Sequence, residues 1–176
     1  VMDEQGLGAA LLFPTLGVGV EEGLRDDIPA TMAAISAFNR WLEDDWGFDH
    51  QQRIIAAPML SLADPDAAVA EVDSLIERGA RIVHVRPAPV PGPNGTSRSL
   101  GNKLFDPVWA RLAEASVPVA FHLGDSGYQR QFGPVWGARD TFGFGNSDPF
   151  AQVLVSDRAI HDTVASLVVH GVFKRH

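Results

Sequence analysis

The sequence contains no cysteine, which excludes disulfide bonds and cysteine-ligated zinc and is consistent with a cytoplasmic protein. Basic residues are also few: 14 Lys and Arg stand against 22 Asp and Glu, and the formal net charge is −8. They are scattered along the chain, whereas a nucleic-acid surface needs clustered Lys and Arg. We therefore expect no nucleic-acid partner.

Long apolar runs are missing as well. The longest apolar stretch, residues 8–20, is too short to span a bilayer and contains Pro14 and several glycines. No basic segment precedes it, so we expect neither a signal peptide nor a membrane partner. With 45% hydrophobic and 20% charged residues, the 176 residues are typical of one globular domain.

What the chain does contain is an alternation of strand and helix patterns. Apolar runs rich in β-formers predict strands that end at Phe13, Leu60, Arg86 and His122. Helical spacing of apolar residues predicts helices over residues 28–46, 65–79 and 160–173, and another beginning at Asp106-Pro107. Asp64 and Pro65 are a helix-start signal, and Gly79 a stop. The Asp-Pro pair recurs at equal spacing at Asp106-Pro107 and Asp148-Pro149.

This alternation predicts parallel strands joined by right-handed crossovers, an α/β fold. Long loops follow the strands and shorter connections precede them, as in a (β/α)8 barrel of the TIM type whose functional face is built from the loops after the strands. Such a barrel needs about 200 to 250 residues. We therefore predict an incomplete barrel, and a small open-sheet α/β binding domain is the alternative.

His122 is the first candidate for chemistry. It ends an apolar strand and precedes a Gly-Asp-Ser-Gly turn, so it is expected at the edge of the sheet where ligands bind. A neutral imidazole there is a good ligand for a divalent metal. Asp125 either orients this imidazole as an outer partner or only forms the turn. Ser126 lacks the pattern of a serine nucleophile.

Arg86 ends the neighbouring predicted strand. Its guanidinium either binds a substrate carboxylate or pairs with an acidic helix. His84, two residues earlier on the same strand face, reads as a packed polar residue. Three further polar residues are expected on the same face of the molecule, namely Thr15, Asn102 and Tyr128. The loop at Gly17-Val-Gly19 is not a dinucleotide fingerprint, because Glu22 stands where the third glycine is needed.

Several segments, taken in order, resemble one known family. They are Phe38-Asn-Arg-Trp-Leu42, Ala57-Pro-Met-Leu-Ser-Leu62 followed by Asp64-Pro65, Phe105-Asp-Pro-Val-Trp109, Val119-Ala-Phe-His122 and Gly171-Val-Phe-Lys-Arg175. Together they are similar to the amidohydrolase family that includes aminocarboxymuconate-semialdehyde decarboxylase. The resemblance implies a metal-dependent barrel that hydrolyses or non-oxidatively decarboxylates a small carboxylate-bearing substrate.

The resemblance also implies a place for each segment. His122 matches the family's metal ligand on the fifth strand, so the chain corresponds to about strands two to five with their helices. The metal, zinc in most members, takes its other ligands from segments outside these residues. Since catalytic zinc has three or more protein ligands, we expect the 176 residues alone to be inactive and to associate, either with the remainder of the barrel or with a second copy. The alternative is a non-catalytic partner-binding or oligomerisation module on the same scaffold.

Overall fold

The computed structural model describes residues 1–15, 17–138, 149–155 and 157–176. Its strands are β1 (Ala10–Leu12), β2 (Asp49–His50), β3 (Ile54–Ala56), β4 (Met59–Leu60), β5 (Val83–Val85), β6 (Val90–Pro91), β7 (Ser97–Arg98) and β8 (Val119–Phe121). Its α-helices are α1 (Val20–Gly23), α2 (Ile28–Asp45), α3 (Pro65–Glu77), α4 (Asp106–Glu114), α5 (Tyr128–Phe132), α6 (Pro149–Val155), α7 (Arg158–Val169) and α8 (Val172–Arg175). Short 3-10 turns are η1 (Gly17–Gly19), η2 (Pro93–Gly95), η3 (Lys103–Phe105) and η4 (Pro134–Trp136).

The strands form three small sheets. β1 pairs in parallel with β3, whose other edge pairs antiparallel with β2. β4, β5 and β8 pair in parallel, in that order, and β6 and β7 form a hairpin. The parallel pairing of sequential strands confirms the α/β prediction, while the described residues contain no closed barrel.

One predicted strand is divided between two sheets. The apolar run that ends at Leu60 was expected to be continuous, yet β3 pairs with β1 and β4 pairs with β5. Pro58 lies between them and has no N–H to donate to a ladder. The Ala57 N–H still reaches the Leu12 carbonyl at 2.9 Å, and the Pro58 carbonyl accepts from His84 N–H at 2.8 Å. The chain thus passes from one sheet to the next at this proline.

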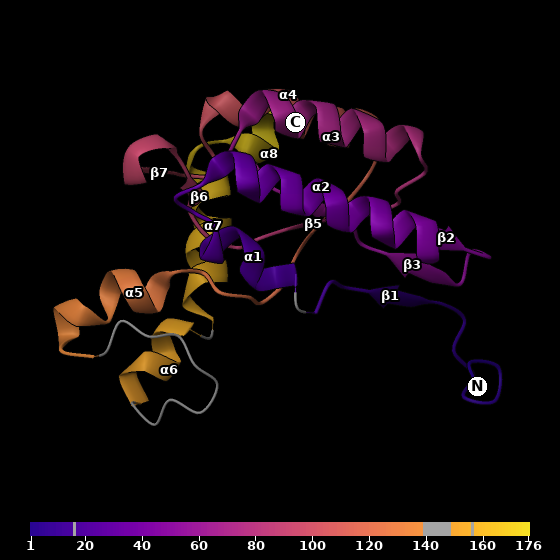
Figure 1. Cartoon of the computed structure of the whole chain (residues 1–176), viewed down its shortest axis with the longest axis horizontal. Helices are drawn as coiled ribbons and strands as arrows, with labels where there is room; N and C mark the ends of the chain where they lie inside the picture. The colour runs from indigo at the N-terminus through magenta and orange to yellow at the C-terminus, as the bar shows by residue number, and fades with distance from the viewer. Residues whose placement is uncertain (16, 139–148, 156) are drawn as a thin grey trace.

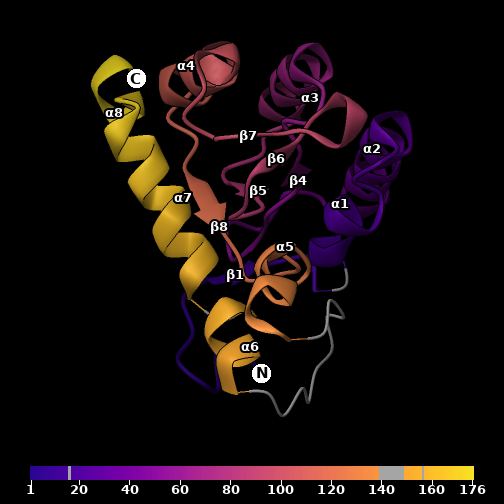
Figure 2. The ribbon, with the colours of Figure 1, turned by 90° about the vertical axis from the view of Figure 1, so that its left-hand side faces the viewer.

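Helices α2, α3 and α4 lie together along one side of the strands, as Figures 1 and 2 show. The core lies between these helices and the β4–β5–β8 sheet and includes the fully buried side chains of Val72, Leu75, Phe105 and Val108. The predicted start of α3 is confirmed: an Asp64 carboxylate oxygen accepts from the N–H groups of Asp66 and Ala67, both at 3.1 Å. Gly79 follows the helix at φ +83°, as its stop signal requires.

Asn39 ties α2 to the sheet. Its side chain is completely buried, donates to the Met59 carbonyl and to a Glu71 carboxylate oxygen, and accepts from the Met59 N–H, each at 2.8 Å. The amide therefore satisfies both backbone groups of Met59, which no side chain without a donor and an acceptor would do.

We expect Asn39→Leu to destabilise the fold by about 1–3 kcal/mol, because the Met59 N–H and carbonyl lose their partner while remaining buried. Urea denaturation measures this. The control is Arg40→Leu on the exposed side of the same helix, which we expect to change stability by less than about 0.5 kcal/mol. Equal stabilities of the two variants would contradict the assignment.

Two predictions about the C-terminal half are confirmed only in part. The helix predicted to begin at Asp106-Pro107 is α4, but Asp106 does not cap it; its carboxylate accepts from Arg175 at 2.6 and 2.9 Å, and this hydrogen bonding lowers the pKa of Asp106. The helix predicted over residues 160–173 is interrupted at Gly171, which adopts φ +70° between α7 and α8. This break places α8 beside α4 (Figure 2), where the Asp106–Arg175 pair joins them.

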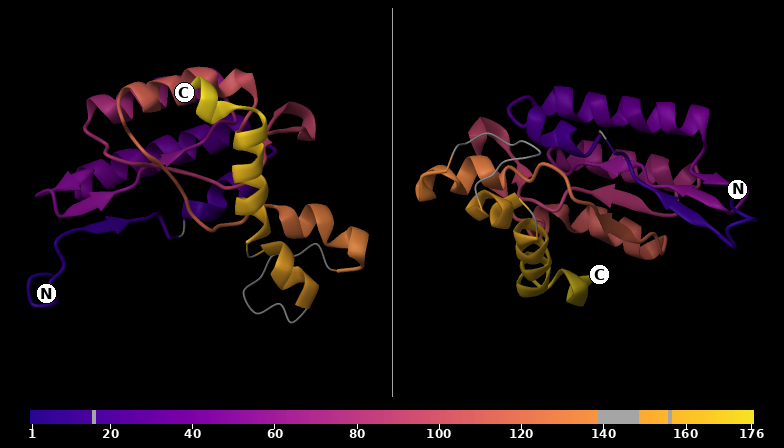
Figure 3. Two further views of the ribbon diagram at one scale, coloured as in Figure 1. Left: turned by 180° about the vertical axis from the view of Figure 1, so that it is seen from behind. Right: turned by 90° about the horizontal axis from the view of Figure 1, so that it is seen from below.

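The remaining elements complete the arrangement. The long segment that follows β5, residues 87–103, contains the β6–β7 hairpin. Helices α5 and α6 lie next to each other on the side away from α2 and α3 (Figures 1 and 3), and the third Asp-Pro signal falls partly outside the described residues, since only Pro149 is described. No helix of the described chain is long and apolar enough to cross a membrane.

Candidate functional site

The β4–β5–β8 sheet has two faces of different character. Val83, Val85 and Leu60 point into the core with the helices. Because side chains alternate along a strand, Met59, His84 and Ala120, which are in register with one another, lie on the opposite face. Arg86 and His122 follow this face just beyond the carboxyl ends of β5 and β8. The predicted site residues of the two strands therefore meet at one edge of the sheet.

His122 is held at this edge by its own backbone neighbour. Its Nδ1 lies 2.6 Å from the Leu123 carbonyl oxygen, which can only accept, so a neutral ring carries its proton on Nδ1. The lone pair then resides on Nε2, the nitrogen left for a metal or a proton. The ring packs against Phe13 at 5.2 Å between centroids, so the end of β1 also contributes to the site.

His84 is the nearest titratable neighbour of His122. The two rings lie edge to face, 6.0 Å between centroids. Burial, and after it the charge of His122, lowers the pKa of His84 to about 4, while a hydrogen bond to the His122 backbone acts in the opposite direction. His84 is 3% exposed, and its Nε2 has no hydrogen-bond partner among the described residues. The ring is therefore neutral at physiological pH.

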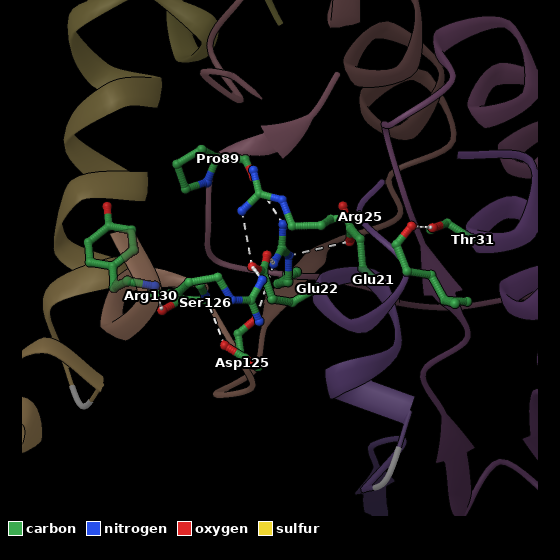
Figure 4. Close-up of polar contacts among 12 residues, drawn as sticks. Glu21, Glu22, Arg25, Thr31, Pro89, Asp125, Ser126 and Arg130 are labelled. Carbon is green, nitrogen blue, oxygen red and sulfur yellow. Dashed lines mark hydrogen bonds and ion pairs between the residues drawn. The ribbon is translucent and has the colours of Figure 1, made fainter. Parts of the chain in front are cut away.

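A cluster of charges surrounds the buried carboxylate of Glu22 (Figure 4). It adjoins His84, since Glu21, His84 and Arg86 line the same small cavity. The Glu22 carboxylate, with 1% of its side chain exposed, pairs with Arg130 at 2.6 Å, Arg86 at 2.7 Å and Arg25 at 3.1 Å. Arg86 also lies 3.6 Å from Glu21 and donates to the carbonyls of Asp125 and Pro89. We call Glu21, Glu22, Arg25, Arg86 and Arg130 the Glu22 cluster. It joins the segments that follow β1, β5 and β8.

Close backbone packing brings α1 into this position. A Cβ atom on Gly17 would lie 2.7 Å from Met59 Sδ, one on Gly124 2.6 Å from the Val18 carbonyl oxygen, and one on Gly127 2.6 Å from a Glu22 carboxylate oxygen. Because these glycines have no Cβ, the η1–α1 segment can lie against the sheet face that carries His84. It also covers a cavity of about 10 Å³ lined by Glu21, His84 and Arg86 among others.

Sequence reasoning missed the two glutamates of α1, because Gly17-Val-Gly19 reads as a glycine-rich loop and no helix is predicted before residue 28. Burial raises the pKa of Glu21, opposed by Arg86 and by a hydrogen bond with Ser61. The only sequence signal is a pair of adjacent acids in an otherwise apolar and glycine-rich stretch, and such a pair is normally solvated.

The structure shows where the predicted site residues lie. Of the two roles considered for Arg86, the structure shows the pairing with an acidic helix, through Glu22 of α1. Its role as a substrate anchor stays a prediction. The Asp125 carboxylate accepts from the Gly127 N–H at 2.9 Å, which is the turn-forming role. Its role as an outer partner of His122 also stays a prediction.

The other expected residues point elsewhere. Tyr128 donates its hydroxyl to Asp162 of α7 at 3.1 Å, and burial first, then Asp162, raises the pKa of Tyr128 to about 12. Asn102 accepts from the Leu104 N–H and begins η3. Thr15 is exposed after β1. None of these side chains has a recorded contact with His122 among the described residues.

The chemistry of His122 fits one metal ligand: a neutral imidazole, oriented through Nδ1, at the edge of a sheet. Within the described chain no group of three or more His, Asp or Glu residues is arranged to hold a metal ion. The described residues thus contain an imidazole suited to a metal ion but no complete set of ligands for one.

Comparison with known proteins places this geometry in context. The amidohydrolase family model matches residues 4–176. An amidohydrolase from Mycobacterium avium subsp. paratuberculosis aligns with 59% identity and a TM-score of 0.90 over 99% of this chain and 44% of its own. A 2,6-dihydroxybenzoate decarboxylase from Rhizobium aligns at 16% identity with a TM-score of 0.69, covering 99% of this chain and half of that one.

Two further similarities cover less of the chain. A 5-carboxyvanillate decarboxylase from Novosphingobium aromaticivorans, a structure with bound manganese, aligns at 23% identity with a TM-score of 0.51 over 71% of this chain and 33% of its own. Among curated proteins, a 3-methyl-2-oxobutanoate hydroxymethyltransferase from Shewanella halifaxensis is 28% identical over 69% of this chain and 40% of its own length. The chain thus spans less than half of these curated relatives and of the first structure.

Proposed function

Because this chain belongs to the amidohydrolase family, we propose that it forms part of a metal-dependent hydrolase or non-oxidative decarboxylase that acts on a small carboxylate-bearing substrate. The resemblance stated from the sequence motifs is confirmed at the level of the family. The decarboxylases of similar fold support the finer assignment to carboxylate chemistry.

We propose further that β1, the β3–β4 run, β5 and β8 are strands two to five of a (β/α)8 barrel. Parallel pairing in chain order and alignment with an amidohydrolase structure over 99% of the chain support this. In such a barrel, the sheet face that carries His84 and Ala120 lines the barrel interior. His122 then lies at the rim where the reaction takes place.

The observation that carries the proposal is the orientation of His122. With Nδ1 held by the Leu123 carbonyl, Nε2 is presented as a ligand at the carboxyl end of β8. A divalent metal bound there, zinc or manganese, supplies Lewis-acid polarisation of a substrate carboxylate or carbonyl, or activates water. The Glu22 cluster keeps the loops around His122 in place. For Arg86 to bind the substrate carboxylate, it would exchange part of its contact with Glu22 for that carboxylate.

Replacing His122 by alanine in the natural full-length protein tests this. We expect its affinity for the divalent metal to fall at least about a hundredfold, more than the loss from an outer partner, and turnover of small carboxylates to fall with it. Elemental analysis of the purified protein measures the bound metal. His161→Ala, at an exposed position of α7, is the control. Unchanged metal content in His122→Ala would reject the ligand assignment.

The second candidate is a non-catalytic module that binds a partner through apolar surface. Exposed apolar side chains favour association of this chain, either with the remainder of the barrel or with a second copy: Leu11 and Leu12 on β1, and Val168, Val169 and Phe173 on α7 and α8. A full-length protein that binds no divalent metal in either the parent or the His122→Ala form would favour this candidate.

A further inference from the structure

His84 does not have the surroundings of a histidine kept for stability. It is buried in the middle of β5, and its Nε2 has no hydrogen-bond partner among the described residues. A buried polar atom without a partner is destabilising, and an apolar side chain of similar volume would fill the same space without that loss. The presence of an imidazole here therefore calls for another explanation.

The contacts of His84 point to His122. In the sheet, His84 is in register with Ala120, and His122 lies two residues further along on the same face. The His84 ring meets the His122 ring edge to face, with 6.0 Å between the centroids. Phe13 packs against the His122 ring at 5.2 Å between centroids. The His122 ring thus has three neighbours that define its position: the Leu123 carbonyl at Nδ1 and the rings of Phe13 and His84.

His122 lies one residue beyond the paired part of the sheet. β8 ends at Phe121, and the ladder to β5 ends at the pair of Val85 with Phe121. The Asp125 carboxylate accepts a hydrogen bond in its own turn. Beyond the last pair of the ladder, the His84 ring contacts the His122 ring from the interior of the neighbouring strand.

We propose that His84 is a positioning residue for His122, fixing the ring of this imidazole at the edge of the sheet. The proposal rests on the proposed function for the identity of the ligand that His122 binds. Its structural part, the placement of the His122 ring, is independent of that function.

The test compares three substitutions in the natural full-length protein. His84→Phe keeps a buried ring but removes both nitrogens, His84→Asn restores a short polar group near the Nδ1 position, and His50→Phe at an exposed site of β2 is the control. We expect His84→Phe to lower the affinity for Zn²⁺, measured by chelator competition, by about 10- to 100-fold, as for other outer partners of metal ligands. We expect His84→Asn to restore part of it and His50→Phe to change nothing.

Two further measurements separate positioning from general stability. The urea midpoint of His84→Phe should equal or exceed that of the parent, because the unpartnered nitrogen is gone. In the metal-free protein with ¹⁵N-labelled histidine, the His122 ring signals, identified by their loss in His122→Ala, should shift in His84→Phe. Unchanged His122 signals would overturn the proposal whatever the metal result. Unchanged Zn²⁺ affinity in His84→Phe, with affinity lost in His122→Ala, would overturn it and leave the proposed function intact. If His122→Ala keeps its metal, the proposed function fails and the His122 signals alone decide on His84.

Discussion

Substituting Glu22 by alanine is expected to destabilise the protein by about 3–5 kcal/mol, the usual cost of removing one member of a buried ion pair. Glu22 pairs with three arginines, and Arg86, with 5% of its side chain exposed, would keep its charge without its 2.7 Å partner. The 3.6 Å contact of Arg86 with Glu21 is too long to replace the lost hydrogen bond. Chemical denaturation measures the loss.

Two controls make this result specific. Glu4→Ala removes an acid whose side chain is 83% exposed, and we expect it to change stability by less than about 0.5 kcal/mol. The double variant Glu22→Leu/Arg86→Met removes both charges, and we expect it to recover part of the loss because the Arg86 charge is no longer buried without Glu22. A Glu22→Ala variant as stable as Glu4→Ala would show that the cluster does not hold α1 to the strand ends.

A methyl group at position 127 is expected to cost about 2–5 kcal/mol. Gly127 adopts φ +74°, which costs an alanine about 1–2 kcal/mol. The added Cβ would also lie 2.6 Å from a Glu22 oxygen, and crowding of this kind costs about 1–3 kcal/mol. Thermal unfolding of Gly127→Ala measures the sum, and we expect the metal affinity of the full-length protein to fall as well, since the turn after His122 is displaced.

Gly79→Ala isolates the backbone part of this effect. Gly79 has a similar φ of +83°, but a Cβ there meets nothing within 4 Å, so only the cost of the left-handed conformation is expected. The difference between the two variants reports the contact of Gly127 with Glu22. If Gly127→Ala costs no more than Gly79→Ala, then α1 does not pack against this turn as closely as described.

The local elements that sequence predicted well are those whose signals act within a few residues. The start of α3 follows from the Asp64 side chain and the ring of Pro65, and its end from Gly79, all without help from the rest of the chain. The position of His122 at a strand end likewise follows from an apolar run and the turn after it. Family membership followed from motifs spread over nearly the whole chain.

Other features depend on partners far away in sequence, which local patterns do not contain. Asp106 precedes a proline just as Asp64 does, but its carboxylate accepts hydrogen bonds from Arg175 and does not cap α4. A charged guanidinium gives stronger hydrogen bonds than a helix N–H. The predicted strand is divided at Pro58 because its first part pairs with β1 and its second part pairs with β5, and both partners are distant in sequence. The cluster around Glu22 spans 108 residues, from Glu22 to Arg130.

By itself, then, the sequence determined the alternation of strands and helices, the helix start at Asp64 and the place of His122 at a strand end, because short-range sterics and hydrogen bonds decide these. Only the tertiary structure decided which side chains surround His122. Glu21 and Glu22 are buried because α1 packs against the ends of the strands, and His84 faces His122 because of the register of β5 with β8. Polar groups buried in this way are shielded from water and must find their partners within the protein.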